Sequence, residues 1–135
     1  MKIKTVVLAA AAAMLAGCQE TAGTRVTIDT RSGESSVLEC SSHLARRVNV
    51  VGVSYGDVEG IKKATVTIES LTHKRLELQA RMVWMDADGV EIDADGKSFR
   101  AIVLDGLDIT TITGVAPSPK CVTARLQLRE TDTAQ

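Results

Sequence analysis

The chain has 135 residues, a formal net charge of −1, and only three aromatic side chains, those of Tyr55, Trp84 and Phe99. Nucleic-acid binding depends on an excess of positive charge, so we expect no nucleic-acid partner. Three scattered rings also exclude a binding platform built from several stacked aromatic side chains.

The first seventeen residues have the pattern of a cleaved export signal. Lys2 and Lys4 give a positive start, and a run of ten apolar residues follows at positions 6–15. This run has the length of a secretory signal and is too short to cross a bilayer as a helix. The segment Leu15-Ala16-Gly17-Cys18 then resembles the lipobox of bacterial lipoproteins, in which cleavage leaves the cysteine as the first residue.

Cys18 is the predicted site of lipidation. Two or more acyl chains, such as palmitate, hold a protein stably on a membrane at about 0.8 kcal/mol per buried methylene, so the protein is expected to be anchored rather than membrane-spanning. Gln19 is not the aspartate that retains such lipoproteins at the inner membrane, which favours the outer membrane, with the protein facing the periplasm. The predicted organisation is a signal peptide at 1–17, the lipidated cysteine and a short tether at 18–24, and one domain at 25–135.

The mature chain is acidic and keeps two further cysteines. The leader holds two of the sixteen basic residues and none of the seventeen acidic ones, so the net charge after cleavage is about −3. Cys40 and Cys121 suit a disulfide in an oxidising compartment. By reducing the entropy of the unfolded chain, such a bridge would raise the free energy of the unfolded state by about 4–5 kcal/mol. Two buried thiols are the alternative, because sequence does not reveal the Cα separation that a bridge requires.

Short runs rich in β-branched residues alternate with turn signals along the mature chain. One turn signal is Arg31-Ser32-Gly33-Glu34, and another is Tyr55-Gly56-Asp57. Segment 41–47 is ambiguous, with Ser42 as a candidate cap for one or two helical turns. The predicted strands cover residues 26–28, 37–40, 48–53, 64–69, 76–84, 90–92, 99–104, 109–115 and 122–129.

The longest amphipathic strand runs from Leu76 to Trp84. Its apolar residues occupy every second position, an arrangement that a helix cannot place on one face. After it, Asp86-Ala87-Asp88-Gly89 predicts a tight turn with Gly89 at positive φ. Seven or eight short strands without a sustained helical period predict an all-β fold, an antiparallel β-sandwich of immunoglobulin-like or transthyretin-like topology.

Carboxylates gather around two Asp-Ala-Asp-Gly repeats and form the one candidate metal site. Oxygen-rich clusters bind calcium, but neither repeat has the glycine and glutamate positions of an EF-hand loop. Two solvated Asp-Gly turns around a short strand are therefore the favoured interpretation, and we expect no metal and no cofactor. The candidate ligands are Asp86, Asp88, Glu91, Asp93 and Asp95.

The sequence offers little material for catalysis. His43 and His73 are the only histidines, and both lie in turn-like surroundings. No nucleophile elbow, zinc-protease motif or phosphate-binding glycine loop is present. Ser41 and Ser42 stand beside His43, but residues adjacent in sequence seldom meet the geometry of a nucleophile and its base. We therefore expect that the protein is not an enzyme.

The segment Leu76–Ile92, LELQARMVWMDADGVEI, resembles the signature of the YcfL-like lipoproteins, a strand with an aromatic residue followed by an Asp-x-x-Gly turn and a return strand. A weaker resemblance extends from Val48 to Arg129. Met82 and Met85 depart from the pattern, which usually has aromatic residues there. The resemblance implies an immunoglobulin-like β-sandwich on a periplasm-facing lipoprotein, and it implies no biochemical activity.

These observations favour a noncatalytic envelope lipoprotein that binds or scaffolds another periplasmic or outer-membrane protein through loops and an edge strand. The alternative is a ligand-binding module for calcium or for an anionic envelope component. In that case the Asp-rich turn or paired basic residues would make the contact, although the same pairs also suit solvated turns and strand edges. The basic pairs are Arg46-Arg47, Lys62-Lys63 and Lys74-Arg75.

Overall fold

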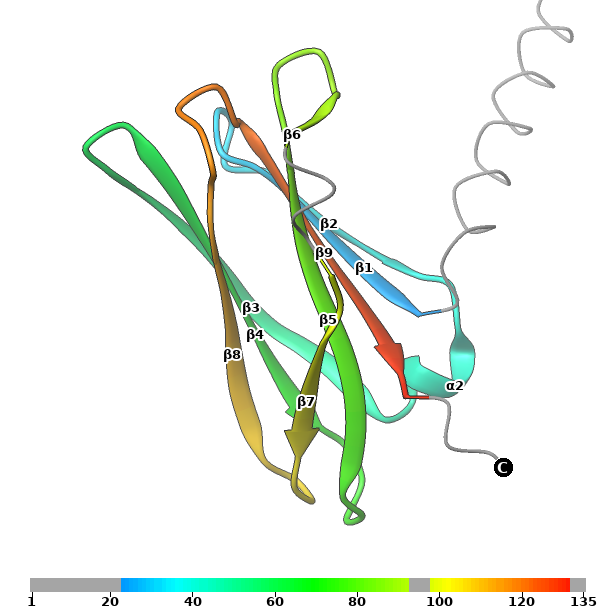
Figure 1. The fold of residues 1–135 in the computed structure, drawn as a ribbon. Coiled ribbons are helices and arrows are strands. Elements are labelled where there is room, and N and C mark those ends of the chain that lie inside the picture. Colours follow the sequence, from blue (N-terminus) through cyan, green and yellow to red (C-terminus); the bar gives the residue numbers. More distant parts are fainter. Residues whose placement is uncertain (1–22, 93–97, 132–135) are drawn as a thin grey trace, which may run out of the picture.

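The computed structural model describes residues 23–92 and 98–131, and in it two antiparallel β-sheets pack face to face (Figure 1). This arrangement confirms the predicted all-β, immunoglobulin-like sandwich. Its one helix in the described ranges is α2 (Ser42–Ala45). The strands are β1 (Thr24–Asp29), β2 (Ser35–Glu39), β3 (Val48–Val58), β4 (Ile61–Ser70), β5 (Leu76–Met85), β6 (Glu91–Ile92), β7 (Arg100–Leu104), β8 (Ile109–Val115) and β9 (Thr123–Glu130).

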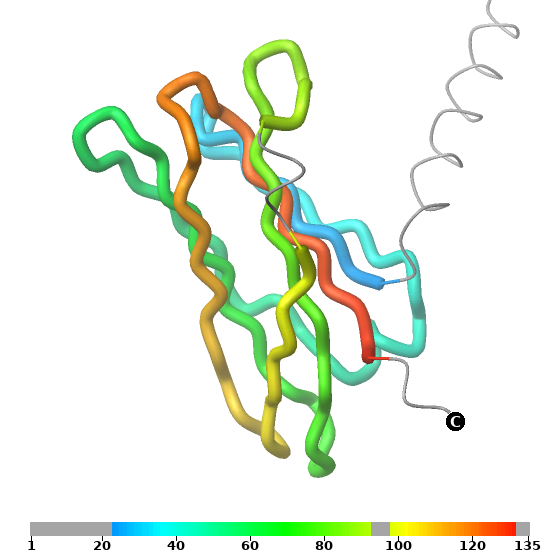
Figure 2. Tube along the Cα trace, in the orientation of Figure 1, coloured from blue at the N-terminus to red at the C-terminus, as the bar shows by residue number. Residues whose placement is uncertain are grey.

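The strands divide unequally between the two sheets. Sheet A has the order β2-β1-β9-β5-β6, and β7 pairs with the other end of the same edge of β5. Sheet B has the order β3-β4-β8. The chain crosses from one sheet to the other after β2, β4, β7 and β8, and Figure 2 allows these crossings to be followed. Strands far apart in sequence, such as β1 and β9, therefore lie side by side.

The apolar core lies between the sheets because alternate residues of each strand point inward. Trp84 is fully buried, which confirms the prediction that it belongs to the core. Each large apolar side chain buried in this way contributes about 1.5–3 kcal/mol. Core members from sheet A include Val26, Ile28, Leu76, Leu78, Met82, Trp84, Leu104, Leu126 and Leu128, and those from sheet B include Val66, Ile68 and Ile112.

The turn predicted at Tyr55-Gly56-Asp57 is wrong, because these residues continue β3 and pair with residues 62–64 of β4. The chain reverses at Glu59 and Gly60, whose φ angles are +54° and +85°. Two interactions of the Asp57 carboxylate stabilise the turn at this position. Asp57 Oδ1 accepts the Gly60 N–H at 2.8 Å, and Asp57 Oδ2 lies 2.7 Å from Lys62 Nζ.

The ambiguous segment 41–47 forms the short helix α2, and its cap is Ser41 rather than Ser42. Ser41 is extended and its hydroxyl accepts the Leu44 N–H at 3.4 Å, which leaves Ser42 inside the first turn. Leu44 fixes the helix by entering the core. Within the described ranges no helix has the length and apolar character needed to cross a membrane.

The structure does not bring Cys40 and Cys121 together, so the predicted bridge between them is absent. The Cys40 N–H donates to Gly23 O, which places Cys40 beside the start of β1. Cys121 is buried before β9, whose first residues pair with the end of β1. The length of β1 at about 3.3 Å per residue separates the two thiols by roughly 20 Å, far beyond the reach of a disulfide.

The Asp57–Lys62 interaction generates a pH prediction. Hydrogen bonds from Lys62 and from the Gly60 N–H hold the pKa of Asp57 below its usual range. Because the charged form is favoured in the fold, its stabilisation is present above the unfolded-state pKa and is lost as the pH falls through the lowered pKa. We expect Asp57→Asn to lower the melting temperature at neutral pH, with the difference from wild type closing in acid.

Thermal unfolding followed by circular dichroism across this pH range measures the effect. Glu59→Gln removes an exposed carboxylate from the same turn and serves as the control. A difference between Asp57→Asn and wild type that stays constant at every pH would contradict the assignment.

Candidate functional site

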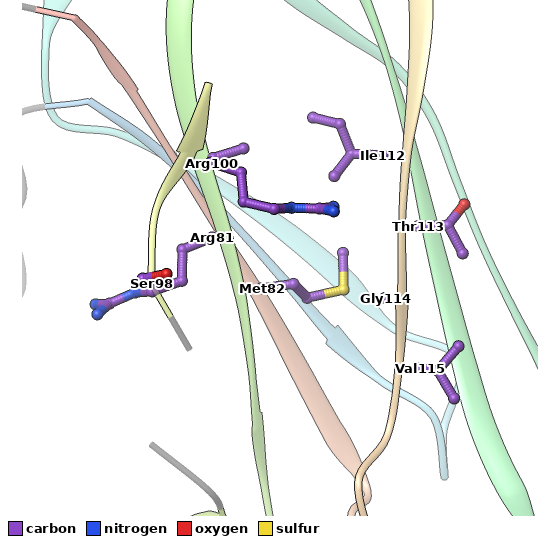
Figure 3. A pocket seen from close by; sticks show the side chains of 9 residues that line it. Arg81, Met82, Ser98, Arg100, Ile112, Thr113, Gly114 and Val115 are labelled. Atoms are coloured by element: carbon purple, nitrogen blue, oxygen red, sulfur yellow. The ribbon is translucent and has the colours of Figure 1, made fainter. Parts of the chain in front are cut away.

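A groove separates the edges of the two sheets on one side of the sandwich (Figure 3). In the described part of the chain, β7 pairs only with β5 and β8 pairs only with β4, so each strand has an open edge here. The groove has a volume of about 360 Å³, and an adjoining depression of about 290 Å³ continues it along the same two strands. Its lining residues are Ala80, Arg81, Met82, Ser98, Arg100, Ile112, Thr113, Gly114 and Val115.

Met82 and Gly114 set the width of the groove. Met82 is almost fully buried and points from β5 toward Gly114 on β8 (Figure 3). A Cβ atom at position 114 would overlap the Met82 sulfur, so Gly114 allows β8 to approach closely without displacing this side chain. The thioether therefore forms an apolar floor between the two sheets.

A second close approach holds β7 and β8 at the far end of the groove. Gly106, in the β7–β8 loop, packs against the main chain of His73, where a Cβ would overlap the carbonyl oxygen. Nearby, the Leu107 N–H donates to Thr72 O at 2.9 Å. These contacts tie the loop between the two open strands to the loop that joins β4 to β5.

Arg100 supplies the positive charge of the groove. Its side chain is exposed and extends from β7 toward Ile112 on β8, whereas Arg81 points away from β8 (Figure 3). The facing strand, β8, reads ITTITGV and has no charged residue. One guanidinium thus faces a wall of threonine and aliphatic side chains.

The candidate metal ligands that lie in the described ranges belong to a turn and to the short strand after it. Asp86 Oδ1 accepts the N–H groups of Asp88 at 2.9 Å and Val90 at 3.0 Å, and Gly89 has the predicted positive φ. Glu91 is exposed at the start of β6. The described ranges contain no group of three or more His, Cys, Asp or Glu residues able to hold a metal ion. The other two candidates, Asp93 and Asp95, lie outside the described residues, as does Cys18.

The histidines and basic pairs do not gather at the groove. His43 Nε2 lies 3.6 Å from Glu130 Oε2 beside α2, and Arg47 Nη1 lies 3.3 Å from the other oxygen of the same carboxylate. Lys62 pairs with Asp57 at the far end of the β3–β4 hairpin. The Ser41 hydroxyl is used as a helix cap and does not face the His43 imidazole as a nucleophile would.

The sequence did not single out Met82, Arg100 or Gly114 as site residues. Alternation along the strand predicts that Met82 points inward, and the lack of charge in 109–115 is visible in the sequence. What sequence does not reveal is that β7 and β8 lie opposite each other in different sheets, since that depends on the order of strands in space.

Comparison with known proteins gives a family and a fold. Residues 35–130 match the model of a family described as "Protein of unknown function (DUF1425)". A DUF1425 family member from Shewanella sp. pv-4 has a similar solved structure, with 25% identity, a TM-score of 0.58, and coverage of 84% of this chain and 94% of that one. Campylobacter jejuni cj0090 is 14% identical with a TM-score of 0.53, covering 61% of this chain and 85% of that one, and it shares the fold. No curated protein matches the sequence.

The role of Asp86 as a turn residue is testable against a role as a calcium ligand. Asp86→Ala removes the acceptor of two main-chain hydrogen bonds and is expected to lower the free energy of unfolding by about 1–2 kcal/mol. Asp86→Asn keeps one side-chain oxygen as an acceptor and should lower the free energy of unfolding by less. Chemical denaturation with and without millimolar calcium measures both effects. A calcium-dependent gain in wild-type stability that both variants abolish would contradict the turn assignment.

Proposed function

The chain belongs to the DUF1425 family of proteins of unknown function, and we propose that it is a noncatalytic envelope lipoprotein that binds an extended segment of another envelope protein along β8. Within this proposal it is a YcfL-like lipoprotein, as the segment Leu76–Ile92 suggests. Lipid on Cys18 anchors it to the outer membrane, with the domain in the periplasm.

The open edge of β8 is the observation that carries the proposal. Proteins guard exposed edges against strand addition with charges, prolines or bulges, and β8 has none of these. Its register with β4 is continuous over all seven residues. The opposite edge of sheet B differs, since β3 is bulged between Val50 and Gly52. Of the two edges of this sheet, β8 is the better template for an added strand.

Two hydrogen bonds show which main-chain groups of β8 face outward. Ala116 N–H donates to Lys62 O, and Ser70 N–H donates to Asp108 O, both at 2.8 Å. Antiparallel pairs alternate between bonded and non-bonded positions, so the even-numbered residues of β8 bond to β4. The Ile109 N–H is satisfied locally by the Asp108 carboxylate at 2.9 Å. The remaining outward groups belong to Thr111, Thr113 and Val115.

Side chains beside this edge suit a protein partner. Val115 lines the groove and is 55% exposed, and Val103 on β7 and Ile109 on β8 are large apolar residues that are 47% and 55% exposed. An added strand would direct alternate side chains into the groove and away from it. Main-chain hydrogen bonds then supply affinity, while the groove and Arg100 supply specificity, as in other strand-addition complexes.

The lipid anchor is tested by metabolic labelling with an alkyne analogue of palmitate. Wild-type protein should carry the label and fractionate with outer membranes. Cys18→Ala should lose the label, because the lipid acceptor is the thiol at this position. Cys40→Ala is the matched control and should remain labelled. A wild-type chain that is unlabelled and soluble in the periplasm would contradict the anchor.

Strand addition is tested by replacing Thr111, which is exposed and faces the open edge. Thr111→Pro removes an N–H that does not bond to β4, so the fold should persist while the partner loses a hydrogen bond. A photo-crosslinking residue at Thr113 reports the partner in cells. We expect Thr111→Pro to reduce the crosslinked product at least about fivefold, the effect of losing roughly 1 kcal/mol.

Thr111→Val is the matched control, because it keeps the main-chain N–H and the shape of the side chain. It should crosslink like wild type, and the melting temperatures of the two variants should be compared in parallel. Equal crosslinking by Thr111→Pro and wild type would sink the edge-strand model, and so would equal losses in both variants.

A further inference from the structure

The outer face of sheet A carries a cluster of arginines around one glutamine. Gln127 on β9 pairs laterally with Arg25 on β1 and Arg81 on β5. Arg125 and Arg129 lie two residues before and after it on the same strand, so all five side chains share one face. Figure 1 shows β1, β9 and β5 side by side. We call these four arginines the arginine face.

Neutral groups support the guanidinium groups of Arg81 and Arg129. Arg81 Nε donates to Gln127 Oε1 at 2.9 Å, and Arg129 Nε donates to Gln79 Oε1 at 2.7 Å. The Phe99 ring lies 4.7 Å from Arg81 Cζ and 3.6 Å from Arg129 Cζ, in cation–π geometry. These contacts orient two guanidinium groups without pairing either of them to a carboxylate of the described residues.

The ion pairs found in the described ranges involve none of Arg81, Arg125 and Arg129. The Arg125 Nε atom is buried without a hydrogen-bond partner among the residues that the structure describes. Acidic residues on the face occur at its margins, where Asp29 pairs with Arg31, Glu77 begins the exposed side of β5, and Glu91 on β6 lies beside Met85. The arginine face thus carries four positive side chains on a chain whose net charge is −1.

The shape of the face indicates the kind of anion that fits. Strand spacing separates the Cα atoms of Arg25 and Arg81 by about 10 Å, and Arg125 and Arg129 are about 13 Å apart along β9. The arginines spread over the outer surface of sheet A, whereas the groove described above runs between β7 and β8. Such an array matches several anions lying in a plane, and guanidinium groups bind phosphate oxygens in bidentate geometry.

We propose that the arginine face docks onto a bilayer surface that contains anionic phospholipids. The location of β1 supports this choice of partner and rests on the lipid anchor of the proposed function. Thr24 begins β1 only six residues after Cys18, so an extended tether holds this sheet within about 20 Å of the membrane. Docking would fix the orientation of the domain and leave β8, in the other sheet, open to its partner.

The test uses the full purified chain mixed with vesicles of phosphatidylcholine alone or of phosphatidylcholine with phosphatidylglycerol. Flotation reports membrane association, and modification by phenylglyoxal, located by mass spectrometry, reports the accessibility of each arginine. We expect Arg81, Arg125 and Arg129 to react about fivefold more slowly on the anionic vesicles, as attraction of about 1 kcal/mol per residue requires. High salt should remove the protection, while the exposed Arg46 and Arg75 should react equally on both vesicles.

The outcomes separate docking from anchoring. If the protein floats with both kinds of vesicle and its arginines are protected only on the anionic vesicles, the lipid anchor and the docking are both supported. If it floats with the anionic vesicles alone, docking is supported and the anchor is overturned. Flotation with both vesicles and no protection overturns docking, and flotation with neither overturns both. Protection that appears only when periplasmic protein is added also overturns membrane docking, since the face would then bind an acidic protein.

Charge-matched variants test the residues themselves. The variant combining Arg81→Gln, Arg125→Gln and Arg129→Gln should lose the preference for anionic vesicles. The control combines Arg46→Gln, Lys63→Gln and Lys74→Gln, which remove the same amount of charge from exposed positions elsewhere. This control should keep the preference for anionic vesicles. If the triple variant does not fold, Arg125→Gln alone serves, because the Arg125 Nε atom has no hydrogen-bond partner in the described ranges. Retained preference in a folded variant would overturn the proposal.

Discussion

The pairing of β9 between β1 and β5 is the constraint on which the rest of the structure depends. This strand is the last in the chain, yet it occupies the middle of sheet A. Its inward residues Ala124, Leu126 and Leu128 are fully buried in the core, while its outward residues form the centre of the arginine face. One alternating strand therefore builds the hydrophobic core and displays charge on the opposite surface.

The parts of the fold that sequence predicts are those with strong alternation. β4, β5 and β9 repeat apolar residues at every second position, and each was located from that pattern. The turn at Tyr55-Gly56-Asp57 was misplaced because a glycine next to an aspartate has the composition of a turn even inside an edge strand. The real turn depends on the bonds from Gly60 and Lys62 to the Asp57 carboxylate, which act over several residues.

The candidate site was harder to predict because it depends on strand order. The Cys40–Cys121 bridge followed from compartment and cysteine count, but the register of β1 with β9 places the two thiols at opposite ends of a sheet. Likewise, alternation along the two strands places Arg81 and Arg129 at polar positions but does not bring them together. The spacing of residues in the sequence does not predict the pairing of β5 with β9 that brings the two arginines together. Nor does it predict that both contact Phe99.

The central place of the last strand also governs the order in which the molecule is completed. Synthesis runs from the N-terminus, so β1 and β5 are made well before β9, and each has one unpaired edge until β9 is present. Pairing across nearly the whole sequence is entropically costly, and domains dominated by such contacts fold in milliseconds to seconds. Until β9 pairs, the newly made chain is thus an incomplete sheet, and the insertion of β9 between β1 and β5 completes sheet A.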